Sequence, residues 1–246
     1  MKYNFEPCFV NIANEKEYIN NISDTISSGS KCTFYYLNSH SYYLANTNFK
    51  FNDAFNAADF IIADGYSIVW AIKILTGKKL NKLVFTYSFF TKLHKLFAEL
   101  SAGVFILGGT EEVINSSREV FKNSYPDINL NGAHHGYFDA EQESDRIIEL
   151  INSSNANVLI VGMGMPKSEI WINENLDKIN ANCIFSVGGF FEFLTKNKKT
   201  APGWMYNSGI EWLFRLAQEP KRLFRRYLQA NPYLVYKTIA LKIRKR

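Results

Sequence analysis

The sequence lacks any apolar run of the roughly 18 residues that a membrane-spanning helix requires, so no segment is predicted to cross a bilayer. The start of the chain, Met1 to Glu6, contains no apolar signal core, and secretion is therefore not indicated. Cysteine is scarce, and the wide spacing and odd number of Cys8, Cys32 and Cys183 favour buried reduced thiols in a cytoplasmic protein over a disulfide framework. The four histidines lack the spacing with cysteine that a zinc site needs, so no metal is predicted.

Acidic residues are absent from the last 27 residues, 220–246, whereas nine of the chain's 28 lysines and arginines lie there. All 23 acidic residues therefore fall in residues 1–219, which carry a net charge of −4 although the whole chain carries +5. Aromatic and aliphatic residues fill the gaps between the basic ones. Such a segment suits an anionic surface, either phospholipid headgroups or nucleic acid.

The rest of the sequence predicts an α/β fold with a mostly parallel sheet, because short apolar runs alternate with longer helical patterns. A chain that is 47% hydrophobic can fill a core, either as one large domain or as a domain with an appendage. The predicted strands are 32–37, 60–63, 104–107, 158–161 and 184–187, with another near 128–130. The predicted helices are 67–76, 89–100, 111–121, 144–151 and 167–176. From Met205 onward, three helices are predicted, separated near Pro220 and Pro232.

Glycines follow three of these strands, as Gly108-Gly109, Gly162 and Gly188-Gly189. Ligands of open α/β sheets bind at the carboxyl ends of the strands, and glycine lets backbone amides approach phosphate closely. The pattern predicts a phosphate-binding edge, although tight turns alone would also explain it. Neither the dinucleotide motif G-x-G-x-x-G nor the P-loop motif is intact, since Lys167 stands where the former needs its third glycine.

Polar residues follow two other strands. Asp64 ends the strand 60–63 and is a candidate general base facing the crevice. It would equally serve to cap the helix that follows. Asn38, in Asn38-Ser39-His40, ends the first strand in the same way, and capping is again the alternative. Together with the glycines, these residues predict one polar rim.

Two further segments offer candidate ligand-binding groups. His135 and its neighbour His134 follow the strand near 128–130. The pair is a candidate metal ligand or acid, and the alternative is that it only forms a turn. No carboxylate or cysteine is spaced to complete a metal site. Tyr137 is able to stack on a base or bond to a ribose. Lys167, after Pro166 at a helix start, is able to reach phosphate, whereas Glu169 suits the positive end of the helix dipole.

These segments, in their order along the chain, resemble the WecG/TagA/CpsF family of bacterial glycosyltransferases. The shorter matches are the Asp-Gly step at 64–65, the LGG strand end at 107–109, Tyr-Pro at 125–126 followed by HGYF at 135–138, VGMGMPKSE at 161–169 and VGG at 187–189. The most specific match lies within residues 201–222, which resemble the family's RAPxW, GLEWLxRL and EPxR. The similarity covers about residues 32–227.

The resemblance implies a Rossmann-like catalytic domain at residues 1–200 and a helical appendage at 201–246 that docks on the membrane and completes the active site. It implies transfer of a sugar from a UDP-sugar to a polyprenyl-diphosphate-linked acceptor in cell-surface polysaccharide synthesis. The donors of the family include N-acetylmannosamine, its uronic acid and glucose. The expected location is peripheral, on the cytoplasmic face of the membrane.

The resemblance also assigns roles to residues. It implies that Asp64 is the catalytic base, and we predict inversion at the anomeric carbon. Arginines of the appendage hold phosphates, and no Asp-x-Asp pair suggests a metal, so no cofactor is expected. The expected substrate-binding residues are Asn38, Lys82, Gly108, Gly109, His135, Tyr137, Gly162, Pro166, Lys167, Glu169, Gly189, Glu192, Arg215, Arg222 and Arg225.

The sequence departs from the family pattern at several positions of the sugar pocket. Ser168 stands in place of Gln, Glu192 in place of Asp, and Thr200 in place of Arg. Lys82 replaces an arginine within a segment that otherwise lacks the family's ERVxGxD motif, and a lysine is a point charge where an arginine is a planar fork. These differences leave the donor open.

Two rival functions are consistent with parts of the sequence. A nucleic-acid-binding protein would use the same basic segment, but it would not need the glycine-ended strands or the Asp-Gly step. A divergent, non-catalytic relative that acts as a membrane-associated scaffold would explain the altered pocket residues. The sequence also leaves the oligomeric state open, including a homo-oligomer.

Overall fold

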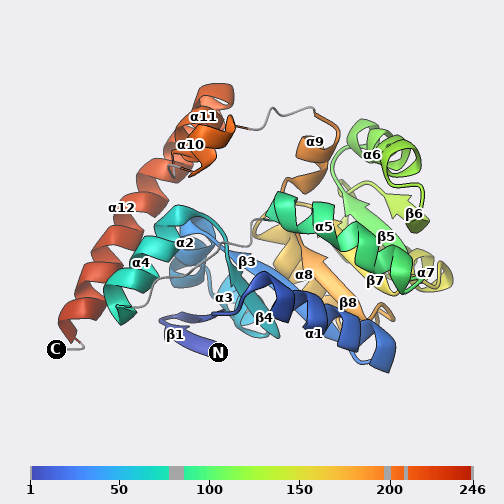
Figure 1. The fold of residues 1–246 in the computed structure, drawn as a ribbon, viewed down its shortest axis with the longest axis horizontal. Coiled ribbons are helices and arrows are strands. Elements are labelled where there is room, and N and C mark those ends of the chain that lie inside the picture. The colour runs from blue at the N-terminus through green and yellow to red at the C-terminus, as the bar shows by residue number, and fades with distance from the viewer. Residues whose placement is uncertain (1, 78–85, 197–200, 208–209, 245–246) are drawn as a thin grey trace.

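The computed structural model describes residues 2–77, 86–196, 201–207 and 210–244 (Figure 1). In this part of the chain, eight strands form a single sheet in the order β1-β2-β4-β3-β8-β7-β5-β6. All neighbouring strands are parallel except β1 and β2, which form an antiparallel pair at one edge. The strands are β1 (Lys2–Phe5), β2 (Cys8–Asn11), β3 (Cys32–Leu37), β4 (Phe60–Ala63), β5 (Gly103–Gly108), β6 (Asn129–His134), β7 (Val158–Gly162) and β8 (Cys183–Ser186).

Helices cover both faces of the sheet. One face is packed by α2 (Ser39–Thr47), α3 (Phe49–Asn56), α4 (Tyr66–Thr76), α7 (Ala140–Ser153) and α8 (Lys167–Asn175). The other face is packed by α1 (Glu15–Ser28), α5 (Thr86–Glu99), α6 (Glu111–Ser124) and α9 (Phe190–Leu194). The remaining helices, α10 (Gly203–Asn207), α11 (Glu211–Gln218) and α12 (Pro220–Arg244), lie beyond α2 and α4 at one side of the molecule (Figure 1).

Successive residues of the inner strands β3, β4, β5, β7 and β8 enter different hydrophobic layers. In β3, Tyr35 and Leu37 join the layer that contains α2, α3 and α4, whereas Phe34 and Tyr36 join the layer that contains α1 and α5. Side chains alternate across a strand, and a parallel sheet covered on both faces therefore needs a continuous apolar run. This requirement explains why the inner strands could be read from the sequence.

The predicted elements agree with the structure in the centre of the fold and differ at its ends. The strands at 32–37 and 60–63 are confirmed without change, and the strand expected near 128–130 instead runs from Asn129 to His134. No elements had been predicted for β1, β2 or α1–α3. All three cysteines are buried and free, as predicted.

The predicted break at Pro232 is wrong, because α12 continues through it. The helix buries Leu223, Ala230, Leu234 and Thr238 on one stripe and packs along α2 and α4. Proline in a helix costs about 3 kcal/mol, whereas burying two leucines contributes about 3–6 kcal/mol. Packing therefore outweighs the local cost. The division of the chain at residue 200 stays a prediction.

Among the described residues, no helix is both long and apolar enough to pass through a membrane.

Candidate active site

The register of the sheet places Asn38 and Asp64 side by side. Leu37 of β3 pairs with Ala63 of β4, and the Asp64 amide donates to the Leu37 carbonyl at 2.7 Å. The two polar residues that follow these strands therefore share one carboxyl edge, as the sequence predicted. Asp64 is half-buried there.

Of these two residues, only Asn38 caps the helix that follows it. Asn38 is the N-cap of α2, and its Oδ1 accepts from the amides of His40 at 3.0 Å and Ser41 at 3.1 Å. The N-cap of α4 is Gly65, one residue beyond Asp64, with a φ of 97° that favours glycine. Capping is thus confirmed for Asn38, while Asp64 precedes the capping position.

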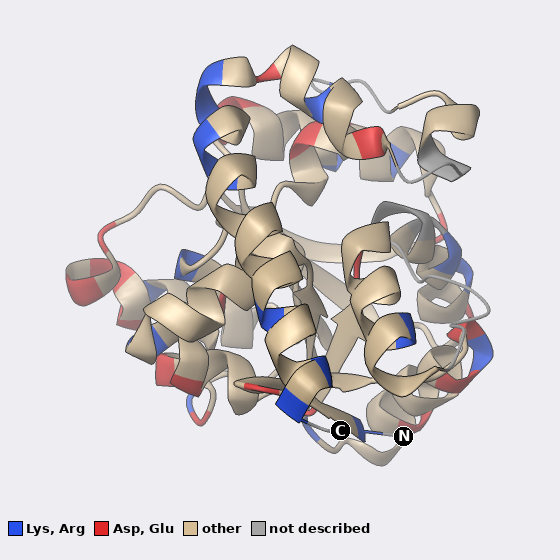
Figure 2. Ribbon diagram, turned by 90° about the vertical axis from the view of Figure 1, so that its left-hand side faces the viewer, with Lys and Arg blue, Asp and Glu red and all other residues tan. Residues whose placement is uncertain are grey.

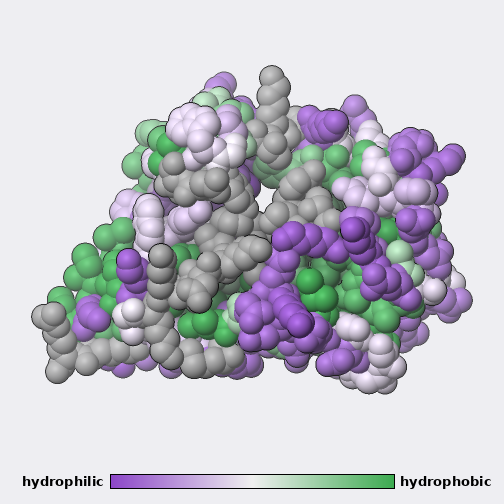
Figure 3. Space-filling model, viewed as in Figure 1, coloured by the Kyte–Doolittle hydropathy of each residue, from purple (hydrophilic) through white to green (hydrophobic). Residues whose placement is uncertain are grey.

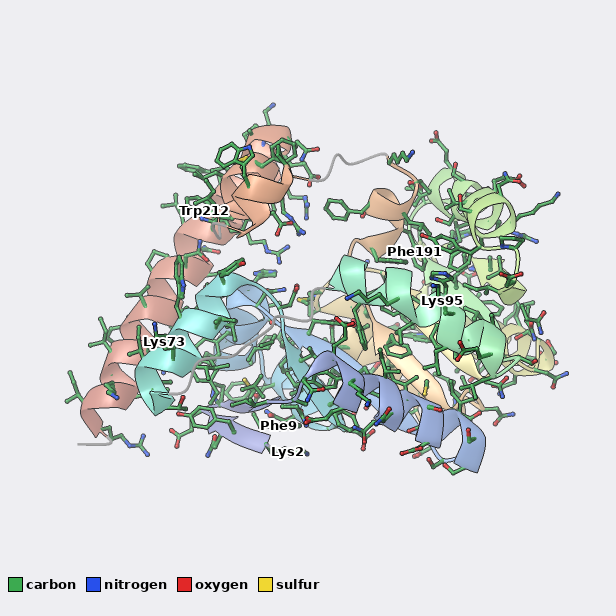
Figure 4. The ribbon with its side chains drawn as sticks, in the orientation of Figure 1. Lys2, Phe9, Lys73, Lys95, Phe191 and Trp212 are labelled. Carbon is green, nitrogen blue, oxygen red and sulfur yellow. The ribbon has the colours of Figure 1, made fainter. Side chains whose placement is uncertain are left out.

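The glycines of the edge are required by close packing. A Cβ on Gly108 would lie 2.5 Å from the carbonyl carbon of Gly162, and φ of Gly108 is 152°. A Cβ on Gly162 would lie 2.7 Å from the ring of Phe191 in α9, which Figure 4 labels. Close packing therefore accounts for both glycines, and phosphate binding by them stays a prediction.

Three arginines of the C-terminal helices gather opposite Asp64: Arg215 of α11, and Arg222 and Arg226 of α12. The Arg215 Nε donates to Glu211 at 2.7 Å, and its guanidinium lies 4.8 Å from the ring centre of Phe193, which follows Glu192 in α9. The Arg222 Nε donates to Glu219 at 3.1 Å. Figure 2 shows the basic residues of α12 gathered toward its two ends, with an uncharged middle.

The carboxylate of Asp64 influences the pKa values of two arginines of this cluster. Burial lowers the pKa of Arg215, but Glu211 and Asp64 outweigh burial, so the pKa is raised. Burial, with help from the charges of Arg222 and Arg215, lowers the pKa of Arg226 to about 10, although Tyr227 and Asp64 act in the opposite direction. The Arg226 Nε is also buried, and it has no hydrogen-bond partner in the described part of the chain. The cluster thus brings three arginines together with Asp64 and with the carboxylates of Glu211 and Glu219.

His40 faces the same arginines from the first turn of α2. Burial, together with the charges of Arg226 and Arg222, lowers the pKa of its imidazole to about 3. The ring is therefore neutral at pH 7 and is available as a hydrogen-bonding group. His40 and Arg226 were not predicted as site residues. The position of His40 at a strand end was a signal for it, but nothing local distinguishes Arg226 from Arg225.

Glu192 of α9 also reaches this cluster. Its charge raises the pKa of Arg222, although the hydrogen bond from Arg222 to Glu219 is the larger cause. Four of the predicted residues, Asp64, Glu192, Arg215 and Arg222, are thus brought together from four elements.

Other predicted residues lie elsewhere. His135 and Tyr137 follow β6, which is five strand spacings, roughly 24 Å, from β4. Tyr137 is 73% exposed, and its amide donates to the Nδ1 of His135 at 3.3 Å. Arg225 is exposed on another side of α12, and Lys82 and Thr200 lie outside the described residues.

The start of α8 contains both accessible and inaccessible groups. Lys167 is exposed at its first position behind Pro166, which has no side-chain oxygen to cap the helix. Glu169 has no accessible surface, and its Oε1 accepts from Ser186 Oγ at 2.7 Å. Gly189 lies against Glu192, since a Cβ there would be 2.6 Å from the Glu192 Oε2. Glu169 is therefore an internal group that no ligand reaches at the surface.

Within the residues described, no group of three or more His, Cys, Asp or Glu side chains is arranged to hold a metal ion. The expected absence of a cofactor stays a prediction.

Comparison with known proteins gives a consistent relationship. A family model described as "Glycosyl transferase WecG/TagA/CpsF family" matches residues 6–246. Proteins of Staphylococcus aureus strains MW2, NCTC 8325 and MRSA252, each named N-acetylglucosaminyldiphosphoundecaprenol N-acetyl-beta-D-mannosaminyltransferase, are 30% identical to the chain over 198 residues. Each match covers 80% of this chain and 76% of the relative.

Proposed function

The chain belongs to the glycosyl transferase WecG/TagA/CpsF family, and from this premise we propose that it moves an N-acetylmannosamine-like hexose from a UDP-sugar to a polyprenyl-diphosphate-linked acceptor. The chain is a glycosyltransferase of the hexosyltransferase class, and its family relationship places it in polysaccharide synthesis. The name of the relatives motivates the choice of donor sugar and acceptor. The observation that carries the mechanism is the position of Asp64 beside the arginine cluster.

Asp64 acts as the general base in this proposal. The acceptor hydroxyl loses its proton to the Asp64 carboxylate as its oxygen attacks the anomeric carbon, and the bond from that carbon to the UDP oxygen breaks on the opposite face. The product has inverted configuration. Because Asp64 ends β4 at the carboxyl edge, it meets substrate where open α/β sheets bind ligands.

The arginine cluster stabilises the leaving group. UDP gains negative charge as the bond breaks, and pre-positioned cations lower the energy of that charge. Arg215, Arg222 and Arg226 supply such cations, and the neutral His40 adds a hydrogen-bonding group. We propose that these groups suffice without a metal.

The enzyme works at the inner membrane face in this proposal, held there by α12. After the basic residues of its first two turns, α12 exposes apolar side chains, including Leu228, Val235 and Ile239. Basic residues precede this stretch, and Lys237 and Lys242 lie among and after its apolar residues, an arrangement that anionic lipid headgroups would favour (Figure 2).

The decisive experiment measures UDP release from UDP-N-acetylmannosamine, UDP-N-acetylglucosamine and UDP-glucose, with a short-chain lipid-diphosphate acceptor that carries N-acetylglucosamine. We expect turnover with at least one donor and greatest turnover with the first. Asp64→Asn lowers kcat by about 10²–10⁴-fold, since a positioned base contributes that much. Asp177→Asn, which changes an exposed carboxylate, is the matched control.

Two results would contradict the proposal. An Asp64→Asn variant within a few-fold of wild-type kcat would exclude Asp64 as the base. No UDP release with any donor would favour the non-catalytic scaffold.

A further inference from the structure

An apolar groove lies between α11 and α12, on the side of α12 where Arg225 is found. Its volume is about 550 Å³, within the range of roughly 300–1,000 Å³ that is usual for small-molecule sites. Its lining is almost entirely apolar, and two exposed cations border it. The lining residues are Leu213, Leu216, Ala217, Pro220, Lys221, Phe224 and Arg225.

No described segment of the chain covers this groove. Leu213 is 43% exposed and Phe224 is 58% exposed, although each would contribute favourable free energy on burial. The groove is shallow and open to solvent, and exposed apolar surface that is bordered by charge is typical of a ligand-binding surface.

The groove is continuous with the arginine cluster of the active site. Arg222, in the cluster, and Arg225, at the groove, are three residues apart on α12, so their Cβ atoms lie about 5–6 Å apart on neighbouring positions of the helix surface. Lys221 lies one turn before Arg225. The N-terminus of α12 at Pro220 adds the positive end of a long helix dipole beside the same two cations. A phosphate group at this point would therefore meet positive charge from both sides.

We propose that this groove binds the hydrocarbon chain nearest the diphosphate of the lipid-linked acceptor, with Lys221 and Arg225 contacting that diphosphate. The inference rests on the proposed function and names the part of the acceptor that this surface recognises. It separates two roles on α12: Arg226 lies near Asp64 and Arg222 near Glu192, whereas Arg225 holds the acceptor from the adjacent side.

The shape and charge favour this occupant over two others. In a twofold contact between copies of the chain, the same surface would meet itself, so that Lys221 and Arg225 would approach their own counterparts and repel them. A bilayer offers no single anionic group at a fixed position, whereas a hydrocarbon chain that ends in a diphosphate matches an apolar groove bordered by Lys221 and Arg225.

The test compares two water-soluble acceptors with the same sugar diphosphate, one bearing a geranyl group and one bearing an ethyl group. For the wild-type protein, we expect a KM at least tenfold lower for the geranyl acceptor. Ala217→Trp fills the groove from an exposed position on α11 and raises the geranyl KM toward that of the ethyl acceptor. Leu150→Trp adds the same side chain at an exposed site on α7, away from the groove, and keeps the tenfold preference.

A second variant and a second measurement guard against effects on folding and on the proposed reaction. Leu213→Asn removes apolar lining without adding bulk and also reduces the chain-length preference. Binding of geranyl diphosphate alone, measured by calorimetry, weakens at least tenfold in both groove variants. An equal geranyl preference in wild type and Ala217→Trp would overturn the inference, as would unchanged affinity for geranyl diphosphate. If neither acceptor is turned over by the wild type while geranyl diphosphate binds in the groove, the proposed function fails and the groove assignment stands.

Discussion

Arg226 combines burial, positive charge and like-charged neighbours in one residue. Its Nε has no hydrogen-bond partner among the described residues, and Arg222 and Arg215 disfavour its charge. A buried cation that lacks full compensation destabilises a folded protein. Local rules are commonly broken at functional sites, and an anionic substrate would supply the missing partner.

Replacing Arg226 by methionine should therefore separate stability from binding. We expect Arg226→Met to raise the free energy of unfolding of the ligand-free protein by about 1–3 kcal/mol, since an apolar side chain of similar length removes the buried charge. The same variant should bind UDP at least tenfold more weakly. Thermal unfolding and calorimetric titration with UDP measure the two effects. Arg225→Met, on an exposed face, is the comparison, and we expect it to change the stability little. A purely structural role for Arg226 would give the opposite pattern, with lower stability and unchanged UDP affinity.

Glu169 predicts a pH dependence of stability. Burial raises the pKa of its carboxyl, and its Oε2 has no partner in the described structure. The folded protein therefore keeps this proton to a higher pH than the unfolded chain. The stability it contributes is fully present below the ordinary carboxyl pKa of about 4.3 and is lost as pH rises through the raised folded pKa.

Glu169→Gln removes this titration while it keeps a side chain of the same shape. We expect the free energy of unfolding of the variant to increase relative to that of wild type as pH rises from 4 to 8, because only the wild type loses stability over this range. Urea denaturation at several pH values measures this difference. Glu149→Gln, at an exposed position of α7, should give a difference that varies less with pH. A flat difference for Glu169→Gln would show that the carboxyl is not perturbed.

At the scale of elements, α12 is an integral part of the fold as well as a basic segment. Its buried stripe recurs at helical spacing and contacts α2 and α4, and Tyr233 packs edge-on against Tyr43 of α2 with ring centres 5.4 Å apart. Near the C-terminus, Arg244 is paired with Glu6, which precedes β2, at 3.3 Å. The helix holds the arginine cluster in position only if this packing is intact.

Leu234→Ala tests the packing of α12. Leu234 is 3% exposed within the core layer that contains α2 and α4, so we expect a loss of about 2–4 kcal/mol in the free energy of unfolding. Val235→Ala, at the exposed neighbouring position, should change it by less than about 0.5 kcal/mol. Chemical denaturation of the full chain measures both. Equal, small effects would mean that α12 detaches readily from the body.

At the scale of the whole molecule, hydrophobic surface gathers on the side formed by α4 and α12 (Figure 3). The exposed apolar residues there are Trp70, Ile74, Val235, Tyr236, Ile239 and Ile243. Lys237 and Lys242 lie on the same stretch of α12. Apolar and basic groups on one side would let that side rest on anionic lipid while the carboxyl edge stays open to both substrates.

Substituting both lysines tests this orientation. We expect Lys237→Gln/Lys242→Gln to reduce partitioning onto phosphatidylglycerol-containing vesicles by roughly 30-fold, since each cation near such a surface contributes about 1 kcal/mol. Flotation with vesicles at fixed salt measures it. Lys95→Gln/Lys122→Gln removes the same charge from α5 and α6, on the other face of the sheet (Figure 4 labels Lys95), and should leave flotation nearly unchanged. Equal losses in the two double variants would show that only net charge matters.

The sequence by itself determined the central strands and the polar edge. The apolar runs at 32–37 and 60–63 end at Asn38 and Asp64, and parallel pairing of neighbouring strands then brings these residues together. It did not predict β1, β2 or α1–α3, whose place depends on contacts with distant segments.

Only the tertiary structure decided which arginines face Asp64. Adjacent residues of a helix point about 100° apart, so the rotation of α12 selects between Arg225 and Arg226. That rotation is set by burial of Leu223, Ala230 and Leu234 against α2 and α4, so it depends on helices that are distant in the sequence. Long-range packing therefore turned Arg226 toward Asp64 and Arg225 toward the groove.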